Sequence, residues 1–333
     1  MKPTIICLTP VRNNACVLER FLLSASLWAD HILICDQMST DTSREIACRF
    51  PKVRLIDNQT EEYNEKERAK LLIDEARRIQ GPRLMIALDA DEIFTPNVLT
   101  STEWQTMITS EPGTVFKFQW ANFCPDLKSM WLGNHFPWGY MDDGQEHISP
   151  NKMHVTRIPL PPNQKALVLN EIKVIHFQFT DWKNMLSKQR WYQCLETINN
   201  PNKSAVDIFR QYHHMFAITE SQIIPIPEAW IKEYSSFGID ILSVNYQEAS
   251  WFESQTLNLI KEHGAGTFRK LDIWDINWVK QAKIIDNSNW KMYKDPRNIF
   301  DKWIQRWLLK TQAKLDKRKN RRVDRFLKSI LNY

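Results

Sequence analysis

The sequence of 333 residues is poor in glycine, with only 8 glycines beside 14 tryptophans. Average glycine usage is about 7%, so this composition excludes fibrous and low-complexity classes. Two glycine-rich phosphate-binding motifs, GxGxxG and GxxxxGK[ST], are also absent. If the chain binds a nucleotide, it does so without either of these loops.

None of the six cysteines forms a CxxC pair. Cys7 and Cys35 lie inside apolar runs typical of buried strands, which favours reduced core thiols in a cytosolic protein. No apolar stretch approaches 18 residues, and the first residues do not resemble a secretion signal. We therefore expect a cytoplasmic protein without a membrane-spanning helix.

The net charge of +5 is unevenly distributed. Residues 301–333 contain eleven Lys or Arg and three Asp or Glu, a net charge of +8, which leaves −3 for the other 300 residues. Phe300, Trp303 and Trp307 recur at helical spacing in this basic tail. Basic amphipathic helices are typical of anionic membrane surfaces, although docking on the body or dimerisation would also use such a helix. The apolar stripe argues against a nucleic-acid partner.

The first 95 residues alternate between two hydrophobic periods. Short apolar runs predict strands at 4–9, 31–35, 53–56 and 83–88, and helical spacing predicts helices at 17–28, 44–50 and 63–79. This alternation predicts an α/β fold with a mostly parallel central sheet and helices on both faces, followed by a helical C-terminal extension. Polar loops at 10–14, 36–41 and 89–92 each follow a strand, so we expect them at one rim of the sheet.

Two of these loops carry carboxylates suited to nucleotide chemistry. Asp89 and Asp91 follow the apolar run RLMIAL, and carboxylates at i and i+2 point to the same side. Such a pair suits Mg²⁺ or Mn²⁺, which can hold nucleotide phosphates, although solvated turns also contain DxD. Asp36 ends the second predicted strand. Its carboxylate could accept a hydrogen bond from a base or ribose, or it could cap its own loop. For Ser39 and Asp41 we favour capping.

The segments TPVRNN (9–14), CDQMSTDTS (35–43) and IALDADE (86–92) resemble, in order and spacing, glycosyltransferase family 2. The resemblance covers roughly the first 95 residues, and ALDADE is most similar to the branch that builds lipopolysaccharide core or related bacterial surface glycans. It implies the GT-A fold and a Mn²⁺ or Mg²⁺ cofactor. It also implies inverting transfer from a nucleoside-diphosphate sugar, most often a UDP-sugar, to a glycan or glycolipid.

Carried over to this chain, the resemblance assigns several donor-site residues. Asp36 would hold the base, and Asp89 and Asp91 would serve the metal and the diphosphate. The remaining positions implied to line the donor site are Pro10, Arg12, Asn13 and Arg68.

A catalytic base and acceptor residues are expected downstream of the DxD. The base takes the proton of the acceptor hydroxyl, and Glu146 is the first candidate, ahead of Asp143. An acidic surface loop is the alternative interpretation of both. Trp131, Trp138 and Tyr140 precede them and could stack on the acceptor sugar, although most tryptophans of this chain must be core residues.

Two further motifs leave their interpretation open. His176, in an apolar run, is either a core residue or a third metal ligand of the kind that several GT-A enzymes possess. Lys188 and Arg190 lie in a stretch similar to the QxxRW signature of processive family members, but Ser187 replaces the glutamine. The two basic side chains would neutralise the leaving diphosphate or face solvent on a helix.

These observations predict a non-processive, metal-dependent glycosyltransferase, cytoplasmic and attached peripherally at the inner face of the cell membrane. We expect a nucleotide-sugar-binding half at 1–120, an acceptor-binding half at 121–250 and a helical extension at 251–333. A nucleotidyltransferase of related sheet architecture would share the paired carboxylates but should carry a glycine-rich loop. A non-catalytic glycan- or membrane-binding protein is the second alternative.

Overall fold

The computed structural model describes residues 2–146, 156–162, 164–243, 251–285, 290–315, 317–331 and 333. The chain divides into two compact units. The first comprises Met1–Thr180 and Ile224–Tyr246, and the second comprises Asp181–Ile223 and Gln247–Tyr333. The predicted boundary at residue 120 is therefore misplaced, since it falls inside a strand of the first unit.

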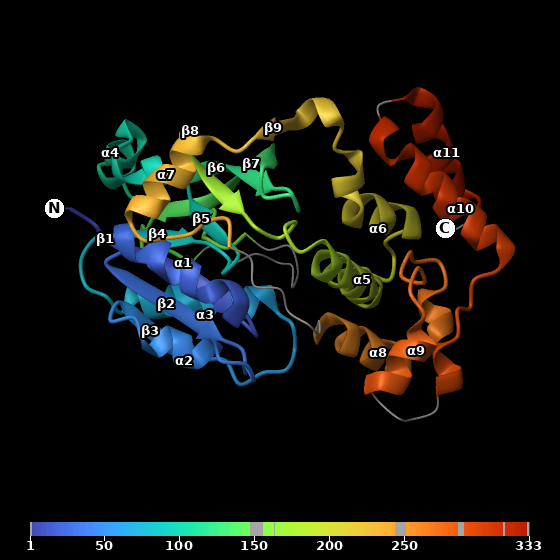
Figure 1. The fold of residues 1–333 in the computed structure, drawn as a ribbon. Coiled ribbons are helices and arrows are strands. Elements are labelled where there is room, and N and C mark those ends of the chain that lie inside the picture. Colours follow the sequence, from blue (N-terminus) through green and yellow to red (C-terminus); the bar gives the residue numbers. More distant parts are fainter. Residues whose placement is uncertain are drawn as a thin grey trace. The chain divides into compact units, whose positions relative to one another are not determined.

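A single mixed sheet forms the centre of the first unit (Figure 1). Its strands are β1 (Thr4–Val11), β2 (His31–Asp36), β3 (Val53–Asp57), β4 (Arg83–Ala87), β5 (Glu92–Phe94), β6 (Val115–Phe123), β7 (Ser129–Met141), β8 (Ala166–His176) and β9 (Ile223–Pro225). They are ordered β3-β2-β1-β4-β7-β6-β8-β5, with β9 beside β7. Strands β3, β2, β1 and β4 are parallel to one another, as β6 is to β8, whereas β7 runs antiparallel to β4 and β6.

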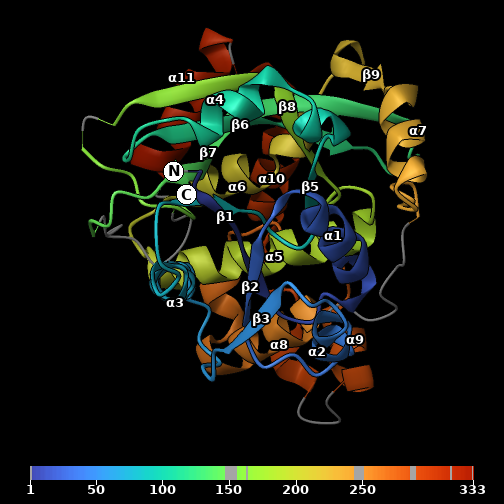
Figure 2. The same ribbon diagram turned by 90° about the vertical axis from the view of Figure 1, so that its left-hand side faces the viewer.

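Helices cover both faces of the parallel half of this sheet (Figure 2). The α-helices of the first unit are α1 (Ala15–Trp28), α2 (Ser43–Cys48), α3 (Glu65–Arg77), α4 (Thr102–Ile108) and α7 (Glu228–Ser236). Ile5 and Cys7 of β1 belong to the core that contains α1, whereas Ile6 and Leu8 belong to the core that contains α3. Because successive strand residues point to opposite faces, burial of both faces explains the continuous apolar runs. The predicted α/β architecture is confirmed.

The rim formed by the carboxyl ends of β1, β2 and β4 gathers the three predicted polar loops. In the parallel register Val11 pairs with Asp36, and Leu8 pairs with Ala87. All three strands therefore end on the same side, as expected. The order β3-β2-β1-β4 also makes the boundary between β1 and β4 a topological switch point, where α/β sheets bind ligands.

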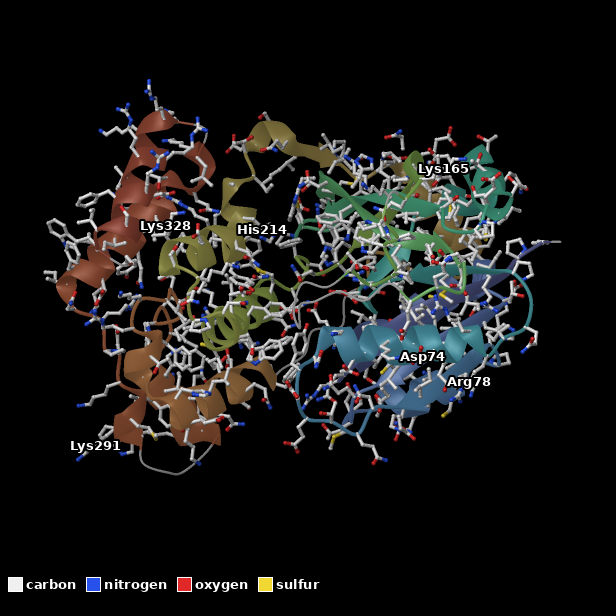
Figure 3. The ribbon with its side chains drawn as sticks, turned by 180° about the vertical axis from the view of Figure 1, so that it is seen from behind. Asp74, Arg78, Lys165, His214, Lys291 and Lys328 are labelled. Atoms are coloured by element: carbon white, nitrogen blue, oxygen red, sulfur yellow. The ribbon has the colours of Figure 1, made fainter. Side chains whose placement is uncertain are left out.

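The second unit is helical, which confirms a helical C-terminal part of the chain. It also contains Asp181–Ile223, which lie before the predicted start of the extension at residue 251. Its helices are α5 (Trp182–Asn199), α6 (Ala205–Tyr212), α8 (Trp251–His263), α9 (Trp278–Ile285), α10 (Ile299–Thr311) and α11 (Arg318–Ser329). Phe209 of α6, Leu308 of α10 and Leu327 of α11 share one core. Lys328 of α11 adds a hydrogen bond of 2.9 Å to Asp207 of α6 (Figure 3). Among the described helices, none is both long and apolar enough to cross a membrane.

Candidate active site

The loops that follow β1 and β2 are locked together by side chains. Asn13, at a left-handed φ of 54°, accepts a hydrogen bond from the Thr40 backbone N–H at 2.8 Å, and its own N–H donates to Ser39 Oγ at 2.9 Å. Asp41 Oδ2 accepts from the Ala15 N–H at the start of α1. The capping interpretation of Ser39 and Asp41 is thus confirmed. The donor-binding role of Asn13 stays a prediction.

Asp36 ends β2 with its side chain almost completely buried. Its Oδ2 accepts from Arg44 Nη1 at 2.7 Å, and the same Arg44 nitrogen lies 2.8 Å from Asp57 Oδ1. Asp36 Oδ1 is buried without a hydrogen-bond partner in the described part of the chain. A buried acceptor left in this state costs free energy that a donor group of a ligand would recover.

Two arginines approach each other beside this loop. Burial lowers the pKa of Arg12, Glu61 raises it, and Arg68 of α3 lowers it further, so the two guanidinium groups are electrostatic neighbours. Arg12 Nη1 donates to the Glu61 carbonyl at 3.5 Å, and the Arg68 guanidinium lies 4.5 Å from the ring centre of Tyr63. Pro10 pairs with Cys35 at the ends of β1 and β2. The structure therefore brings Pro10, Arg12 and Arg68 to one rim, and their donor-binding role stays a prediction.

The carboxylates after β4 surround a buried glutamate. Glu92 is fully buried: its Oε2 accepts from the Asp89 N–H at 2.9 Å, and its Oε1 accepts from Trp120 Nε1 at 2.9 Å. Arg157 bridges Glu92 and Asp89, with 2.6 Å between its Nη2 and Asp89 Oδ2. Burial raises the pKa of Glu92 to about 7, against the opposing effect of Arg157.

Arg157 is one functional candidate that the sequence does not reveal. It lies 68 residues beyond Asp89, in a stretch whose sequence predicts no regular element. Burial opposes its charge, but Asp89 and Glu92 together raise the pKa of Arg157. A lone arginine outside any motif gives no signal that it will return to the DxD loop.

His176 and Asp91 meet at the same rim, which the metal-ligand interpretation of His176 requires. Asp91 Oδ2 lies 3.7 Å from His176 Nε2, while His176 Nδ1 is 2.9 Å from Asn122 Oδ1. The imidazole also stacks on Trp120, with 4.8 Å between ring centres. When Nδ1 donates to the Asn122 amide oxygen, the lone pair of Nε2 faces Asp91, which is the tautomer a metal ligand needs.

These residues fit a divalent cation only in part. No group of three or more His, Cys, Asp or Glu within the described residues is arranged to enclose a metal. Asp91 and His176 offer two ligands that face each other, while Arg157 holds Asp89. Mg²⁺ and Mn²⁺ commonly bind through one or two side chains together with substrate phosphates. The donor set fits that kind of site rather than an all-protein cage.

The predicted bases do not join this site. Because β7 runs antiparallel to β4, Met141 pairs with Leu84, and the Asp142 N–H donates to the Arg83 carbonyl at 2.9 Å. Asp142 thus lies beside the start of β4, whereas Asp89 follows its end, about 20 Å away along the strand. Its buried carboxylate is paired there with Arg77 and Arg83.

Asp143 and Glu146 follow Asp142, at the end of the strands opposite to the rim. Asp143 Oδ1 accepts from the Gln145 N–H at 2.8 Å, and Glu146 Oε1 lies 3.7 Å from Lys70 Nζ of α3 with its side chain 65% exposed. This position favours the alternative interpretation, an acidic surface loop. The expectation that Glu146 or Asp143 lies beside the donor is not met, because a single long strand, β7, carries the chain away from the rim.

The predicted acceptor aromatics are buried. Tyr140 is fully buried in the core beneath α3, so its predicted stacking role is wrong. Trp138 is 3% exposed and Trp131 is 7% exposed, the latter packed against Phe179 at 4.6 Å between ring centres. These positions argue against sugar stacking by any of the three.

Lys188 and Arg190 lie on α5, in the second unit. Arg190 is buried and binds Asp275 with both sides of its guanidinium, at 2.7 Å for Nε and 2.5 Å for Nη2. Lys188 Nζ lies 5.9 Å from the ring centre of Tyr192. Both side chains therefore have contacts within their own unit, and their donor-binding role stays a prediction.

No family model matches the sequence, and a search of curated proteins finds no match. Similar solved structures include glucosyl-3-phosphoglycerate synthase from Mycobacterium tuberculosis with Mn²⁺, UDP and phosphoglyceric acid, at 18% identity over 35% of this chain and 43% of that chain, with a TM-score of 0.26. They also include 4-diphosphocytidyl-2C-methyl-D-erythritol synthase, at 14% identity over 46% of this chain and 71% of that chain, with a TM-score of 0.26. Mannose-1-phosphate geranyltransferase from Thermus thermophilus is similar at 15% identity over 44% of this chain and 51% of that chain, with a TM-score of 0.27. This chain thus spans less than half the length of the first of these proteins, and values this low assign it neither a family nor a reaction.

Proposed function

We propose that this chain is a glycosyltransferase of GT-A type. It would move a sugar from a nucleoside-diphosphate sugar to a glycan or glycolipid, and a UDP-sugar is the donor that we expect first. The supporting observation is that Asp36, the last residue of β2, and Asp91, which follows β4, share one rim on either side of β1. Strands two positions apart are separated by about 10 Å. A nucleotide that crosses the end of β1 would reach Asp36 with its base and the Asp91 loop with its phosphates.

Asp36 and the two arginines form the nucleotide end of this proposal. The buried Asp36 Oδ1 would accept an N–H of the base, while Arg44 fixes the other oxygen. Arg12 and Arg68 would place positive charge on the path from base to diphosphate.

Asp91, His176 and Asp89 form the diphosphate end. Asp91 and His176 would hold Mn²⁺ or Mg²⁺, which supplies positive charge to the leaving diphosphate when bound. Asp89 would join them only if Arg157 released it. Arg157 stays close enough, through Glu92, to donate to a phosphate oxygen in exchange.

The finer form of the proposal is inverting, non-processive transfer to an acceptor of the bacterial surface polysaccharide or lipopolysaccharide type. The motif resemblance supports this class of acceptor. Ser187 stands where processive members have glutamine, and here its buried hydroxyl donates to Glu253 at 3.0 Å. We expect a side chain other than Glu146 or Asp143 to take the acceptor proton.

Donor hydrolysis and transfer assays test the proposal. A panel of nucleotide sugars with Mn²⁺ should give nucleoside diphosphate as the product. A nucleotidyltransferase would instead release pyrophosphate, and only when it is given a nucleoside triphosphate and a sugar phosphate. Asp91→Asn should lower turnover by about 100-fold or more. Asp74→Asn, which changes an exposed aspartate of α3 (Figure 3), should retain it. Turnover that survives Asp91→Asn would contradict the metal site, and no turnover with any donor would favour the non-catalytic alternative.

A membrane surface is the second partner that we propose. Phe300 and Trp303 on α10 and Phe326 on α11 are at least half exposed, close in sequence to the basic block 314–322. Such exposed apolar side chains with neighbouring Lys and Arg favour anionic lipid. Trp303→Ser should reduce sedimentation with phosphatidylglycerol vesicles, and Trp290→Ser is the control. Unchanged sedimentation would contradict this partner.

A further inference from the structure

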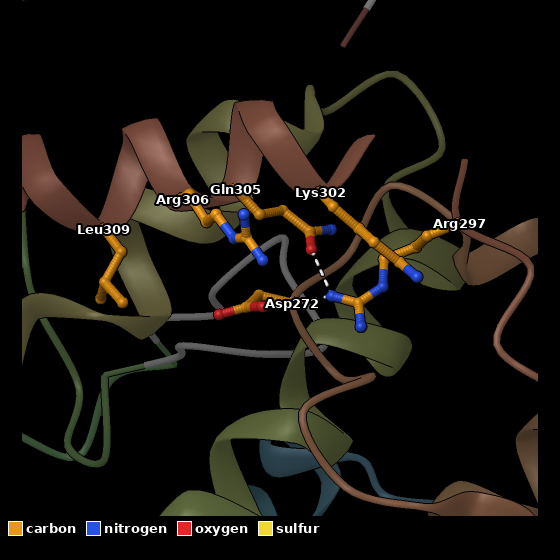
Figure 4. A pocket seen from close by; sticks show the side chains of 6 residues that line it. All are labelled: Asp272, Arg297, Lys302, Gln305, Arg306 and Leu309. Carbon is orange, nitrogen blue, oxygen red and sulfur yellow. Dashed lines mark hydrogen bonds and ion pairs between the residues drawn. The ribbon is translucent and has the colours of Figure 1, made fainter. Parts of the chain in front are cut away.

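A cavity of about 280 Å³ lies within the second unit, between α10 and the loops that precede it (Figure 4). Its lining residues are Asp272, Arg297, Lys302, Gln305, Arg306 and Leu309. Three of the six are cations and one is an anion. The space equals that of roughly nine water molecules in the liquid, which is enough for a phosphate and part of its ester group.

The inner wall of this cavity is held rigidly. Arg297, 12% exposed, donates to the Trp274 carbonyl at 2.7 Å and to Gln305 Oε1 at 2.6 Å, and it is paired with Asp295 at 3.0 Å. Gln305 in turn donates to the Leu271 carbonyl at 2.8 Å. The Arg297 guanidinium is therefore positioned before any ligand arrives, which lowers the entropic cost of binding.

The carboxylate in the cavity is largely compensated. Asp272 Oδ2 lies 3.1 Å from His213 Nε2, and its Oδ1 lies 3.9 Å from Arg297 Nη1. Lys302 Nζ lies 3.7 Å from Oδ2 of Asp295, a residue that does not line the cavity. Repulsion of an incoming anion by Asp272 is weakened by these partners.

Arg306 is the cation of this cavity whose N–H donors are available to a ligand. Within the described residues it forms no ion pair and no hydrogen bond through its side chain. Figure 4 shows its guanidinium extending from α10 on the side of the helix that faces Asp272. Five N–H donors in a planar fork match the oxygens of a phosphate.

We propose that this cavity binds a phosphate group, supplied either by a lipid headgroup or by a free phosphate ester. Arg306 and Lys302 would contact the phosphate oxygens at the open side, and Arg297 would supply charge from within. A dianion suits a cluster of three cations better than a single carboxylate does. Ile299, Phe300 and Trp303 are exposed on the same helix, which suits the lipid source in particular. This proposal does not depend on sugar transfer.

Calorimetric titration of the full chain with inorganic phosphate and glycerol 3-phosphate tests the cavity. Arg306→Gln should weaken binding about tenfold, because it removes a charge-assisted hydrogen bond. Lys310→Gln is the matched control, since it removes an equal charge from an exposed position of α10 that does not line the cavity. Because Arg306 is exposed and has no partner among the described residues, the variant should keep the parent's circular dichroism and melting temperature.

Vesicle sedimentation separates the two sources. If Arg306→Gln also lowers binding to phosphatidylglycerol vesicles, and glycerol 3-phosphate competes with them, the phosphate is that of a lipid. If only titration with soluble phosphate changes, the source is a free phosphate ester. The proposal is overturned if the parent gives no binding heat, or if Arg306→Gln and Lys310→Gln have equal effects.

Discussion

Arg157 forms an ion pair with Asp89, with 2.6 Å between Nη2 and Oδ2. One of the two predicted metal-binding carboxylates is therefore neutralised by the protein itself. The same guanidinium compensates the buried charge of Glu92. Arg157 therefore connects the stability of the sheet to the electrostatics of the proposed diphosphate site.

Arg157→Gln should lower the free energy of unfolding by about 3 kcal/mol, because it leaves Glu92 buried without its cation. Urea unfolding in the presence of a chelator measures this loss. The variant should also bind Mn²⁺ more tightly without donor, since Asp89 is released, and electron paramagnetic resonance of Mn²⁺ detects it. Arg157→Lys is the control that keeps the charge. Equal Mn²⁺ affinity in parent and Arg157→Gln would show that Asp89 takes no part in metal binding.

Asp36→Ala should raise the donor KM by about tenfold or more, through loss of a charged hydrogen bond to the base. Steady-state hydrolysis of the best donor measures it. Arg44→Gln removes the protein partner of the same carboxylate and should change KM by less than about threefold. Equal effects of both substitutions would mean that Asp36 acts only by holding Arg44.

Glu146→Gln and Asp143→Asn should leave turnover close to that of the parent, because both residues follow β7 at the end of the strands opposite to the rim. Initial transfer rates at saturating donor and acceptor measure this. A loss of about 100-fold in either variant would restore the first prediction, and would require the acidic segment to reach the rim during catalysis.

Arg190→Gln should affect stability and not donor binding. The substitution breaks the two-pronged contact with Asp275 inside the second unit, at an expected cost of about 2 kcal/mol. Thermal unfolding and donor KM are measured side by side, with Lys188→Gln as the control on the same helix. A raised KM at unchanged stability would instead support a diphosphate role.

Cysteine reactivity should follow burial. Burial raises the pKa of the Cys35 thiol to about 11, and it also raises the pKa of Cys7 and Cys194, whereas Cys48 is exposed. At pH 8 a disulfide reagent should label Cys48 in the fast phase, and Cys48→Ser should remove that phase. Rapid labelling of Cys7 or Cys194 in the folded protein would show that the cores open more readily than their packing indicates.

The parallel half of the fold could be predicted because each of its strands is a continuous apolar run followed by a polar loop. Asp36 and Asp91 were found in this way, since parallel strands necessarily end at the same rim. The strand β7 could not be found, because Gly133, Pro137 and Gly139 interrupt its alternation. At Gly139 a side chain would lie 3.0 Å from Phe116 Cβ, so close packing between strands, and not a turn, requires the glycine.

Missing β7 had a direct effect on the predicted site. The sequence pattern shows no strand there, so it predicts that the acidic segment lies near Asp89 and Asp91 and that Tyr140 is accessible. Arg157 and Asn122 were missed for a related reason, because their roles come from long-range pairing that no local pattern encodes.

The interleaving of the two units bears on how the chain folds during synthesis. Tyr234, Ile239 and Ile241 belong to the same core as Ile5 and Phe21, yet the chain builds residues 181–223 of the other unit between them. The sheet unit therefore cannot complete its core until about 240 residues have left the ribosome. At that point α5 and α6 have been synthesised, but the later helices that share their cores have not. Cys194 and Phe209 belong to cores that are completed only by later helices, so their apolar side chains stay exposed during that interval.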